Sequence, residues 1–550
     1  MAQVELEAVE LQPDGASASA GAAAVGGIAS AATLIALGNV ASRVLGLARD
    51  TVIAGLFGAT GLVSAFDVAS RVPRMLFDLL IDGLVSSALV PVFSELAERD
   101  RTELWRVASI MLSLATLVMS LGALLLELFA PQVAWIMAGG FDPDLLAQIV
   151  RLMRITTPAV LFLSLSGIVT GLLYALKRFT LPAFTAAAFN ASIVVVASVL
   201  TGRFGWGVES LALGLLIGSA MQVALQIPGL RGVRVRFALD WNHPELRRIA
   251  RLYAPVILGL VISQLGIVID RNLASRTGEQ SIAWMRYATT LVQFPLGLVS
   301  VAIAMAILPT LSRLASPSRP ELLDAFMETL ATGLKMVLVL ILPAVVGLFV
   351  LSEPIVALVF QHGDFTAFDT QQTALALRIY LLGTTFAAID LPLVYAFYAR
   401  KSTLTPAMVG MLGVGLYLAA ALLPTFFHDL YMTDLVLANS VQLTGHALVM
   451  LWLTHRVGSL RGRGLKTTAL KALAAGLMMG GLVFFSVQWL LSRFSAPTLL
   501  AELVVVGGAG CIGIATYAAL VTLLGIEEVG MLVKLVRQRV SKLTGPVAED

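Results

Sequence analysis

Long apolar runs separated by short polar connections dominate the chain. Each run reaches the length of about 20 residues that an α-helix needs to cross the hydrocarbon core of a membrane. The apolar positions within a run are continuous rather than alternating, which argues against a membrane β-barrel. Fourteen runs are found, at roughly 28–57, 62–93, 104–130, 146–175, 181–201, 206–229, 252–274, 281–311, 328–352, 368–398, 404–426, 431–454, 468–491 and 498–525. The pattern predicts an all-α polytopic membrane protein with about 14 transmembrane helices.

Composition supports this prediction and excludes several classes of protein. Hydrophobic residues make up 58% of the chain and charged residues 13%, whereas soluble domains carry about 25% charged residues. A soluble enzyme, a disordered chain and a disulfide scaffold are therefore excluded. Cys511 is the single cysteine, and the five histidines show no metal-ligand spacing. We expect no metal, no cofactor and no nucleic-acid partner.

The basic residues of the connections indicate how the chain is oriented. If the N-terminus lies inside, the inner connections and the C-terminal tail hold 24 of the 37 Lys and Arg residues. The outer connections hold only three, and ten lie within the spans. Because basic loops are retained in the cytoplasm, this alternation predicts that both termini are cytoplasmic.

The two halves of the chain share a repeated pattern. Val90-Pro91 matches Leu308-Pro309 at an offset of 218 residues. Four further residues recur 224 positions later: Arg154, Tyr174, Lys177 and Pro182 become Arg378, Tyr398, Lys401 and Pro406. Matched helices lie six helices apart, an even number, so the repeats share one orientation in the membrane. Parallel repeats of this kind are a known plan of transporters.

These observations divide the chain into six segments. We expect a disordered cytoplasmic tail at 1–25, an N-lobe of helices 1–6 at 26–230, a cytoplasmic amphipathic linker at 231–251, a C-lobe of helices 7–12 at 252–457, two further helices at 458–526 and a cytoplasmic tail at 527–550. The last two helices fall outside the repeat.

Ionisable residues inside the spans concentrate on the opening helices of the two repeats. An ionisable group in mid-bilayer costs about 2.5–3.5 kcal/mol on insertion scales, so each should face a cavity or a partner. Helix 2 carries five of them at spacings of three or four residues, which places them on one face: Asp67, Arg71, Arg74, Asp78 and Asp82. Helices 1, 7 and 8 add Arg43, Arg49, Asp50, Asp270, Arg271 and Arg286.

Two interpretations of these charges remain open. They could form a self-neutralising ion-pair network that holds two bundles together, or they could line a water-filled cavity with an excess of arginine. We favour the cavity, because the planar guanidinium group suits phosphate and carboxylate ligands. Lys335 and Arg378 stand alone in long apolar helices, and we expect them to extend toward an interface.

The stretch from Ser42 to Asp50, followed by Phe57-Gly58-Ala59, resembles the MurJ/MviN family of lipid II flippases in the MOP exporter superfamily. The similarity continues through Asp82-Gly83, Arg178-Phe179 and Phe365-Thr366, and covers about residues 28–525. The resemblance implies two pseudo-symmetric six-helix lobes and two extra C-terminal helices that form a groove for a lipid tail.

The family's substrate is the undecaprenyl-diphosphate-linked precursor of peptidoglycan, whose diphosphate is thought to bind cavity arginines. By resemblance Arg43, Arg49 and Asp50 carry over directly, and Asp82 stands where the family usually has Glu. At other positions where the family has a charged residue, this sequence has a residue of different character: Phe77, Asp78, Thr289, Thr290, Gln293 and Ser64. Yet Arg74, Arg286 and Asp67 lie one turn away on the same face, so we interpret each charge as relocated by a turn.

The resemblance thus implies a transporter, not an enzyme, in the bacterial plasma (inner) membrane. It would move lipid II from the inner to the outer leaflet by alternating access, with membrane lipids and cell-wall synthesis machinery as further partners. The expected binding residues are Arg43, Arg49, Arg74 and Arg286. The expected ion-pair or gating residues are Asp50, Asp67, Arg71, Asp78, Asp82, Asp270 and Arg271.

Two alternatives stay open at this point. One is a related exporter of another polyprenyl-linked saccharide or a drug. The other is a membrane transferase that uses polyprenyl diphosphates. Some family members bind a coupling cation on helices 7, 11 and 12, but helix 11 has no carboxylate or Asn in its centre here. We therefore do not expect sodium coupling.

Overall fold

The computed structural model describes residues 15–315, 320–493, 498–526 and 528, and all regular structure within them is helical. Eleven of these helices are long and apolar enough to cross a membrane. Two bent pairs, Pro143–Thr156 with Ala159–Ala175 and Pro244–Ala254 with Gly259–Ser275, raise the number to 13. These 13 spans and the first helix, α1, together give the number of about 14 transmembrane helices that the sequence predicts. The all-α prediction is confirmed.

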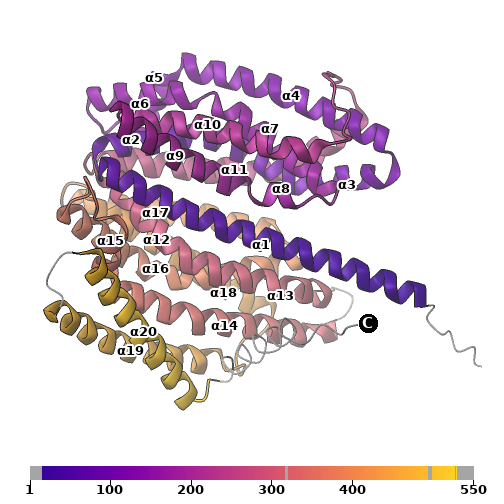
Figure 1. Cartoon of the computed structure of the whole chain (residues 1–550). Helices are drawn as coiled ribbons and strands as arrows, with labels where there is room; N and C mark the ends of the chain where they lie inside the picture. Colours follow the sequence, from indigo (N-terminus) through magenta and orange to yellow (C-terminus); the bar gives the residue numbers. More distant parts are fainter. Residues whose placement is uncertain (1–14, 316–319, 494–497, 527, 529–550) are drawn as a thin grey trace, which may run out of the picture.

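The first half of the chain forms one bundle, coloured indigo to magenta in Figure 1. Its helices are α1 (Gly15–Phe57), α2 (Gly61–Phe77), α3 (Val90–Arg99), α4 (Arg101–Leu128), α5 (Ala130–Ala138), α6 (Pro143–Thr156), α7 (Ala159–Ala175), α8 (Thr180–Ala183), α9 (Thr185–Phe204) and α10 (Glu209–Gln226). Alanine is the strongest helix former, and the Ala-rich start of α1 covers residues 15–25 of the tail that we expected at 1–25. Residues 1–14 lie outside the described part.

The second half forms a bundle below the first, coloured pink to orange in Figure 1, with two gold helices at its lower edge. Its helices are α11 (Pro244–Ser275), α12 (Ser281–Pro295), α13 (Val301–Leu314), α14 (Leu323–Val350), α15 (Ser352–Phe360), α16 (Ala367–Ala399), α17 (Leu404–Leu422) and α18 (Met432–Val457), followed by α19 (Leu465–Arg493) and α20 (Leu499–Leu523). The predicted tail at 527–550 lies outside the described residues except for Glu528.

The repeat seen in the sequence is also present in the backbone. π-Helical turns at Asp78–Asp82 and Leu296–Ser300 are 218 residues apart. Lys177 and Lys401 are 224 residues apart, and they are the non-glycine residues with positive φ in the described part, at 60° and 59°. Each ends its helix with the same backbone hydrogen bond of 2.9 Å, to Tyr174 and to Tyr398. The two lobes are therefore copies of one plan.

The two additional helices are attached to the C-lobe by polar contacts. Lys335 on α14 forms an ion pair of 2.9 Å with Glu528, beyond the end of α20, and these side chains are 15% and 9% exposed. The Tyr517 hydroxyl on α20 donates to the Val339 carbonyl at 2.7 Å. Lys335 therefore does not stand alone as the sequence suggested, because Glu528 supplies a partner for it.

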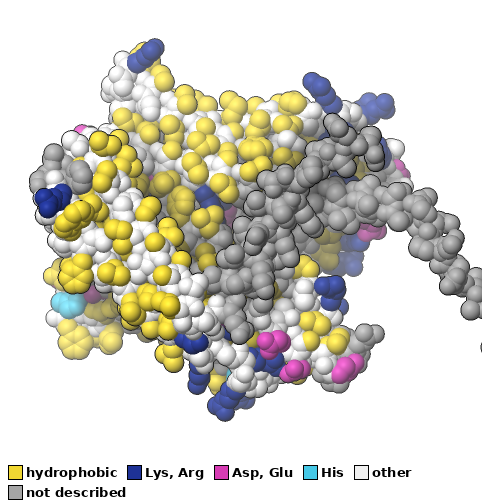
Figure 2. Space-filling view, turned by 60° about the horizontal axis from the view of Figure 1, so that its bottom comes forward, with side chains coloured by type: hydrophobic (Ala, Val, Ile, Leu, Met, Phe, Trp, Pro, Cys, Tyr) yellow, Lys and Arg dark blue, Asp and Glu magenta, His cyan; other side chains and the backbone are white. Residues whose placement is uncertain are grey.

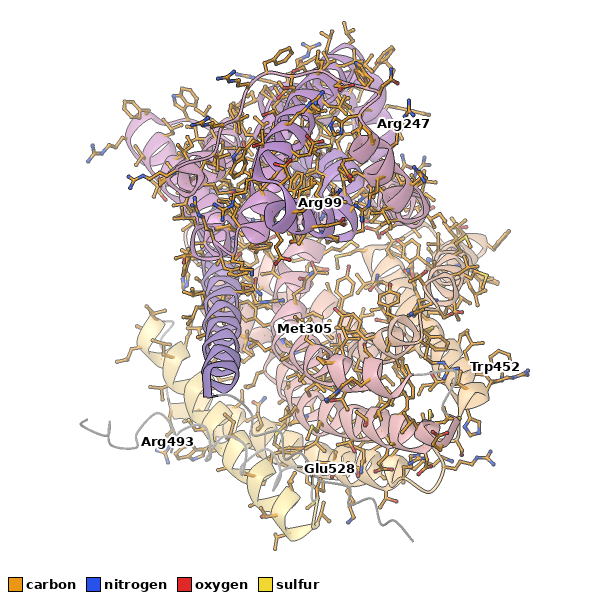
Figure 3. The ribbon with its side chains drawn as sticks, turned by 90° about the vertical axis from the view of Figure 1, so that its right-hand side faces the viewer. Arg99, Arg247, Met305, Trp452, Arg493 and Glu528 are labelled. Atoms are coloured by element: carbon orange, nitrogen blue, oxygen red, sulfur yellow. The ribbon has the colours of Figure 1, made fainter. Side chains whose placement is uncertain are left out.

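The segment between the lobes is extended before it becomes helical. Residues 231–243 contain no helix, and α11 begins at Pro244. The segment lies along α4, where Arg236 N donates to Ser109 Oγ and Ala238 N to Ser113 Oγ, both at 3.0 Å. In Figure 3, Arg99 and Arg247 lie in the upper bundle, and Met305 lies on α13 in the lower bundle.

The outer surface suits a lipid environment. Large apolar side chains are exposed on several spans, including Leu121 (57%), Leu477 (60%) and Phe485 (70%). Figure 2 shows one face, on which hydrophobic side chains predominate and most Lys and Arg side chains lie toward the edges. Exposed apolar surface on this scale is expected of helices that contact lipid.

Candidate functional site

A cavity of about 430 Å³ lies between the two lobes, and α1, α2, α11 and α12 supply its charged side chains. Six arginines and three aspartates line it: Arg43, Arg49, Arg71, Arg74, Arg271, Arg286, Asp50, Asp67 and Asp78. Their formal charge is +3. The structure thus brings together all four arginines that we predicted to bind a head group. Asp270 lines a neighbouring cavity, and the side chain of Asp82 lies outside the described part.

Helical spacing explains why these residues meet. Residues three or four positions apart share one face of a helix, and the cavity is lined by such sets on three helices. On α1 the set is Arg43, Gly46, Arg49 and Asp50. On α2 and the π-helical turn that follows it, the set is Asp67, Ser70, Arg71, Arg74 and Asp78. On α12 it is Arg286, Thr289, Thr290 and Gln293. Arg74 and Arg286 therefore face the same cavity as Arg43 and Arg49.

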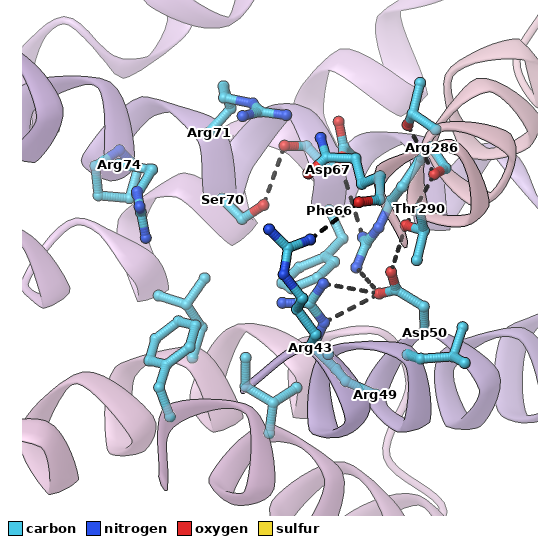
Figure 4. Close-up of a pocket in the computed structure, with 18 of the residues that line it drawn as sticks. Arg43, Arg49, Asp50, Phe66, Asp67, Ser70, Arg71, Arg74, Arg286 and Thr290 are labelled. Atoms are coloured by element: carbon cyan, nitrogen blue, oxygen red, sulfur yellow. Dashed lines mark hydrogen bonds and ion pairs between the residues drawn. The ribbon is translucent and has the colours of Figure 1, made fainter. Parts of the chain in front are cut away.

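Asp50 is the most deeply buried acid of the cavity, with 1% of its surface exposed. Its Oδ1 accepts from Arg286 Nη2 at 2.7 Å and lies 2.9 Å from Arg49 Nη2. The Thr290 hydroxyl donates to Oδ2 at 2.8 Å. Figure 4 shows Arg49, Arg286 and Thr290 gathered around this carboxylate. A buried charge with several partners of this kind is strongly held.

The ion pairs continue from Asp50 into the C-lobe. Arg286 Nη1 lies 3.7 Å from Asp67, and Arg271 Nη2 lies 3.5 Å from the same carboxylate. Arg271 Nη1 is also 3.9 Å from Asp270. We call this series, Arg49–Asp50–Arg286–Asp67–Arg271–Asp270, the inter-lobe ion-pair chain. Its three central pairs join the two lobes: Asp50–Arg286, Arg286–Asp67 and Asp67–Arg271. The network interpretation therefore describes part of the site.

The arginines of the cavity differ in how they are paired among the described residues. Arg43 donates to the backbone carbonyl of Gln293 at 3.0 Å. Arg71 forms no ion pair with any residue in the described part of the chain. Arg74 forms a pair of 2.9 Å with Asp78, but 53% of its side chain is exposed, and it lies apart from the others in Figure 4. The excess positive charge therefore resides mainly on Arg43 and Arg71.

The sequence-based site prediction did not include Asn190 on α9. Its side-chain oxygen accepts from Arg49 Nη1 at 3.0 Å, and its amide nitrogen donates to the Ser42 carbonyl at 3.1 Å. Asn190 thus fixes the direction of the Arg49 guanidinium. A single Asn in an otherwise apolar span is the signal that could have identified it.

The lobes meet closely at the C-terminal end of α1. Asp364 N donates to the Gly55 carbonyl at 3.1 Å, and the Tyr287 hydroxyl donates to the Gly58 carbonyl at 3.1 Å. Ala283 N donates to Ser64 Oγ at 3.2 Å. A Cβ at Gly363, where φ is +58°, would overlap the Gly55 carbonyl, so glycine is required for this contact. These contacts close the cavity at the end that we predict to be outer.

Comparison with known proteins decides the family. The family model described as "Lipid II flippase MurJ" matches residues 53–504. The chain belongs to the MurJ family. It is 30% identical over 524 residues to a probable lipid II flippase MurJ of Vibrio cholerae, covering 91% of this chain and 95% of the relative. It is 29% identical to the lipid II flippase MurJ of Burkholderia cenocepacia over 67% of this chain and 73% of that relative.

Solved structures show the same fold. A MurJ lipid II flippase in an inward closed conformation superimposes with a TM-score of 0.75 at 24% identity, covering 90% of this chain and all of that one. An inward-facing multidrug resistance MATE transporter of the MOP superfamily follows with a TM-score of 0.60 at 16% identity, covering 80% of this chain and 96% of that one. The MurJ family fold thus accounts for nearly the whole chain.

Proposed function

We propose that the protein transports lipid II from the inner to the outer leaflet of the bacterial inner membrane, with both termini in the cytoplasm. The observation that supports this most directly is the cavity charge of +3 in a chain of the MurJ family. A diphosphate carries the opposite charge, and arginine binds it through paired hydrogen bonds. No bond is made or broken, so a transporter and not an enzyme is required.

The ion-pair chain suggests how the head group is bound. Within the described part of the chain Arg43 and Arg71 form no ion pair, so they are available to contact the diphosphate first. Arg49 and Arg286 then exchange Asp50 for phosphate oxygens, which weakens the pairs between the lobes. The lobes can then rock apart at the outer end, while the polyprenyl tail stays in lipid along α19 and α20. Arg74, at the edge of the cavity, would guide entry.

Membrane potential can drive this movement. A potential that is negative inside favours outward transfer of an anion by about 2.3 kcal/mol per charge per 100 mV. The excess of arginine also argues against a cationic drug as substrate, although MATE transporters share the fold. A cationic drug would require an excess of carboxylates in the cavity.

The test is a flipping assay in proteoliposomes with lipid II, a teichoic-acid precursor and an O-antigen precursor as separate substrates. We expect transport of lipid II and a decrease of about tenfold or more in Arg71→Ala, since hydrogen bonds to charged groups contribute about 1.5–3 kcal/mol. Arg106→Ala is the matched control, because Arg106 is exposed on α4 and pairs with Asp240 outside the cavity. Equal transport by both variants, or transport of another precursor in place of lipid II, would contradict the proposal.

A second prediction concerns the position of Arg43. A Cβ added at Gly297 would overlap the Arg43 guanidinium. We therefore expect Gly297→Ala to displace Arg43 and lower lipid II flipping about tenfold, with the net charge unchanged. Gly481→Ala is the control, because nothing lies within 4 Å of the Cβ that it adds on α19. Equal flipping by the two variants would show that Arg43 need not occupy this position.

A further inference from the structure

A cavity of about 710 Å³ lies at one end of the C-lobe, between α15, α16, α19 and α20. It shares no lining residue with the central cavity. Figure 1 shows α15 next to the gold helices α19 and α20, and α20 packs directly on α15. These elements meet at the end of the C-lobe that we predict to be outer. The cavity is therefore separate from the proposed head-group site.

This cavity contains an ion pair that has a counterpart in the N-lobe. Arg378 Nη2 lies 3.8 Å from Glu353, and the equivalent arginine of the repeat, Arg154, lies 3.9 Å from Glu127. The Arg154 side chain is 58% exposed, whereas that of Arg378 is 37% exposed. The C-lobe pair is more enclosed because α19 and α20 pack on α14 and α15. The two additional helices thus turn a surface pair into part of a walled cavity.

Glu502, in the first turn of α20, lines the same cavity. Its Oε2 is buried and forms no hydrogen bond with any residue that the structure describes. Burying a carboxylate oxygen without a donor is costly. The helix dipole favours a negative charge at this end of α20, but it supplies no donor to Oε2. A ligand that carries N–H groups would supply one.

The charges of the cavity call for a ligand with both a cationic and an anionic group. Glu353, Glu502 and Arg378 are its charged lining residues and give it a formal charge of −1, whereas the central cavity has +3. A cation suits Glu502. The contact of 3.8 Å between Arg378 and Glu353 is longer than a hydrogen bond, so the guanidinium retains donors for an anion.

The apolar lining of the cavity continues onto surface that suits lipid. Val487 and Val505 are buried, at 5% and 2% exposure, in the cluster that α19 and α20 form. Phe484 and Leu491 also line the cavity, and they are 50% and 45% exposed. Both helices meet the length and hydropathy of membrane spans. A ligand with acyl chains can therefore reach the polar lining from the bilayer.

We propose that this cavity binds an aminophospholipid, with its ammonium group on Glu502 and its phosphate on Arg378. The primary ammonium donates to the Glu502 carboxylate, and the phosphate accepts from the guanidinium. The acyl chains contact the apolar side chains of α19 and α20. Because Glu502 is on α20 and Arg378 is on α16, the bound lipid fastens the two additional helices to the C-lobe. The site does not depend on the proposed transport of lipid II.

Native mass spectrometry of the full chain in detergent tests this site. Phosphatidylethanolamine, phosphatidylcholine and phosphatidylglycerol with the same acyl chains are the separate probes. We expect phosphatidylethanolamine to bind most tightly, because the choline group has no N–H donor and glycerol has no cation. Glu502→Gln should weaken its binding about tenfold. Glu127→Gln is the matched control, since it removes the acid of the equivalent N-lobe pair and should leave binding unchanged.

A second variant tests the cavity without changing its charge. Ala367 is exposed at the start of α16 and lines the cavity, so Ala367→Phe should fill part of it and also weaken phosphatidylethanolamine binding. Equal binding of the three lipids by the wild-type protein would overturn the proposal. So would unchanged phosphatidylethanolamine binding in Glu502→Gln or in Ala367→Phe. Competition by soluble phosphoethanolamine at the same concentration as the lipid would assign the cavity to a soluble amine and overturn the lipid site.

Discussion

Arg286→Ala is expected to abolish complementation of a flippase-depleted strain. Arg286 pairs with both Asp50 and Asp67, and only 11% of its side chain is exposed. Its removal leaves these carboxylates inside the membrane with less compensation. Breaking a buried pair in this way costs about 3–5 kcal/mol. The effect should therefore exceed that of Arg74→Ala, which also removes a cavity charge but leaves only the partly exposed Asp78 without its partner.

A paired variant separates stability from transport. In Arg286→Ala with Asp50→Asn, the unpaired acid is removed together with its partner. We expect the amount of folded protein in the membrane to recover while flipping stays absent, because a head-group contact has still been lost. Normal complementation by Arg286→Ala at wild-type protein level would show that this arginine is needed neither for the fold nor for the substrate.

Cross-linking the lobes where they meet should stop transport completely. Ser64 on α2 and Ala283 on α12 are in contact across the lobes, with Ala283 N 3.2 Å from Ser64 Oγ. Cysteines at both positions, in a Cys511→Ser background, can form a disulfide that holds this end closed. We expect lipid II flipping to fall to background after oxidation and to return with a reductant, because alternating access requires the lobes to separate there.

The natural sequence suits this experiment, because Cys511 is its only cysteine and is exposed. The two single-cysteine variants are the controls. Oxidation should leave their lipid II flipping unchanged, because neither can form the disulfide between the lobes. Undiminished flipping by the fully cross-linked protein would show that the lobes need not part at this end. It would also remove the physical basis for rocking as the mechanism.

Much of the architecture could be predicted because the bilayer imposes simple rules. The apolar runs located the helices, and the repeat located equivalent turns such as those at Lys177 and Lys401. Arg74 and Arg286, which we interpret as charges relocated by one turn, both line the central cavity. Helical spacing carries this information, because it fixes which side chains share a face before any packing is known.

The pairing of charges could not be predicted in the same way. Spacing along α2 placed Asp67 on a polar face without indicating its partners, which are Arg271 and Arg286 of the other lobe. Such pairs depend on how two bundles pack, which a local pattern does not contain. The same reason explains why Asn190 and the Lys335–Glu528 pair were not predicted.

The inter-lobe ion-pair chain also bears on the half of the cycle in which nothing is carried. A transporter that has released its cargo must return, and six arginines without counterions would repel one another as the cavity closes. Asp50, Asp67 and Asp78 act as built-in counterions for three of them. The same pairs hold the lobes together until an anion replaces the carboxylates. The protein without substrate would therefore stay in one conformation, and it would carry few small anions across the membrane.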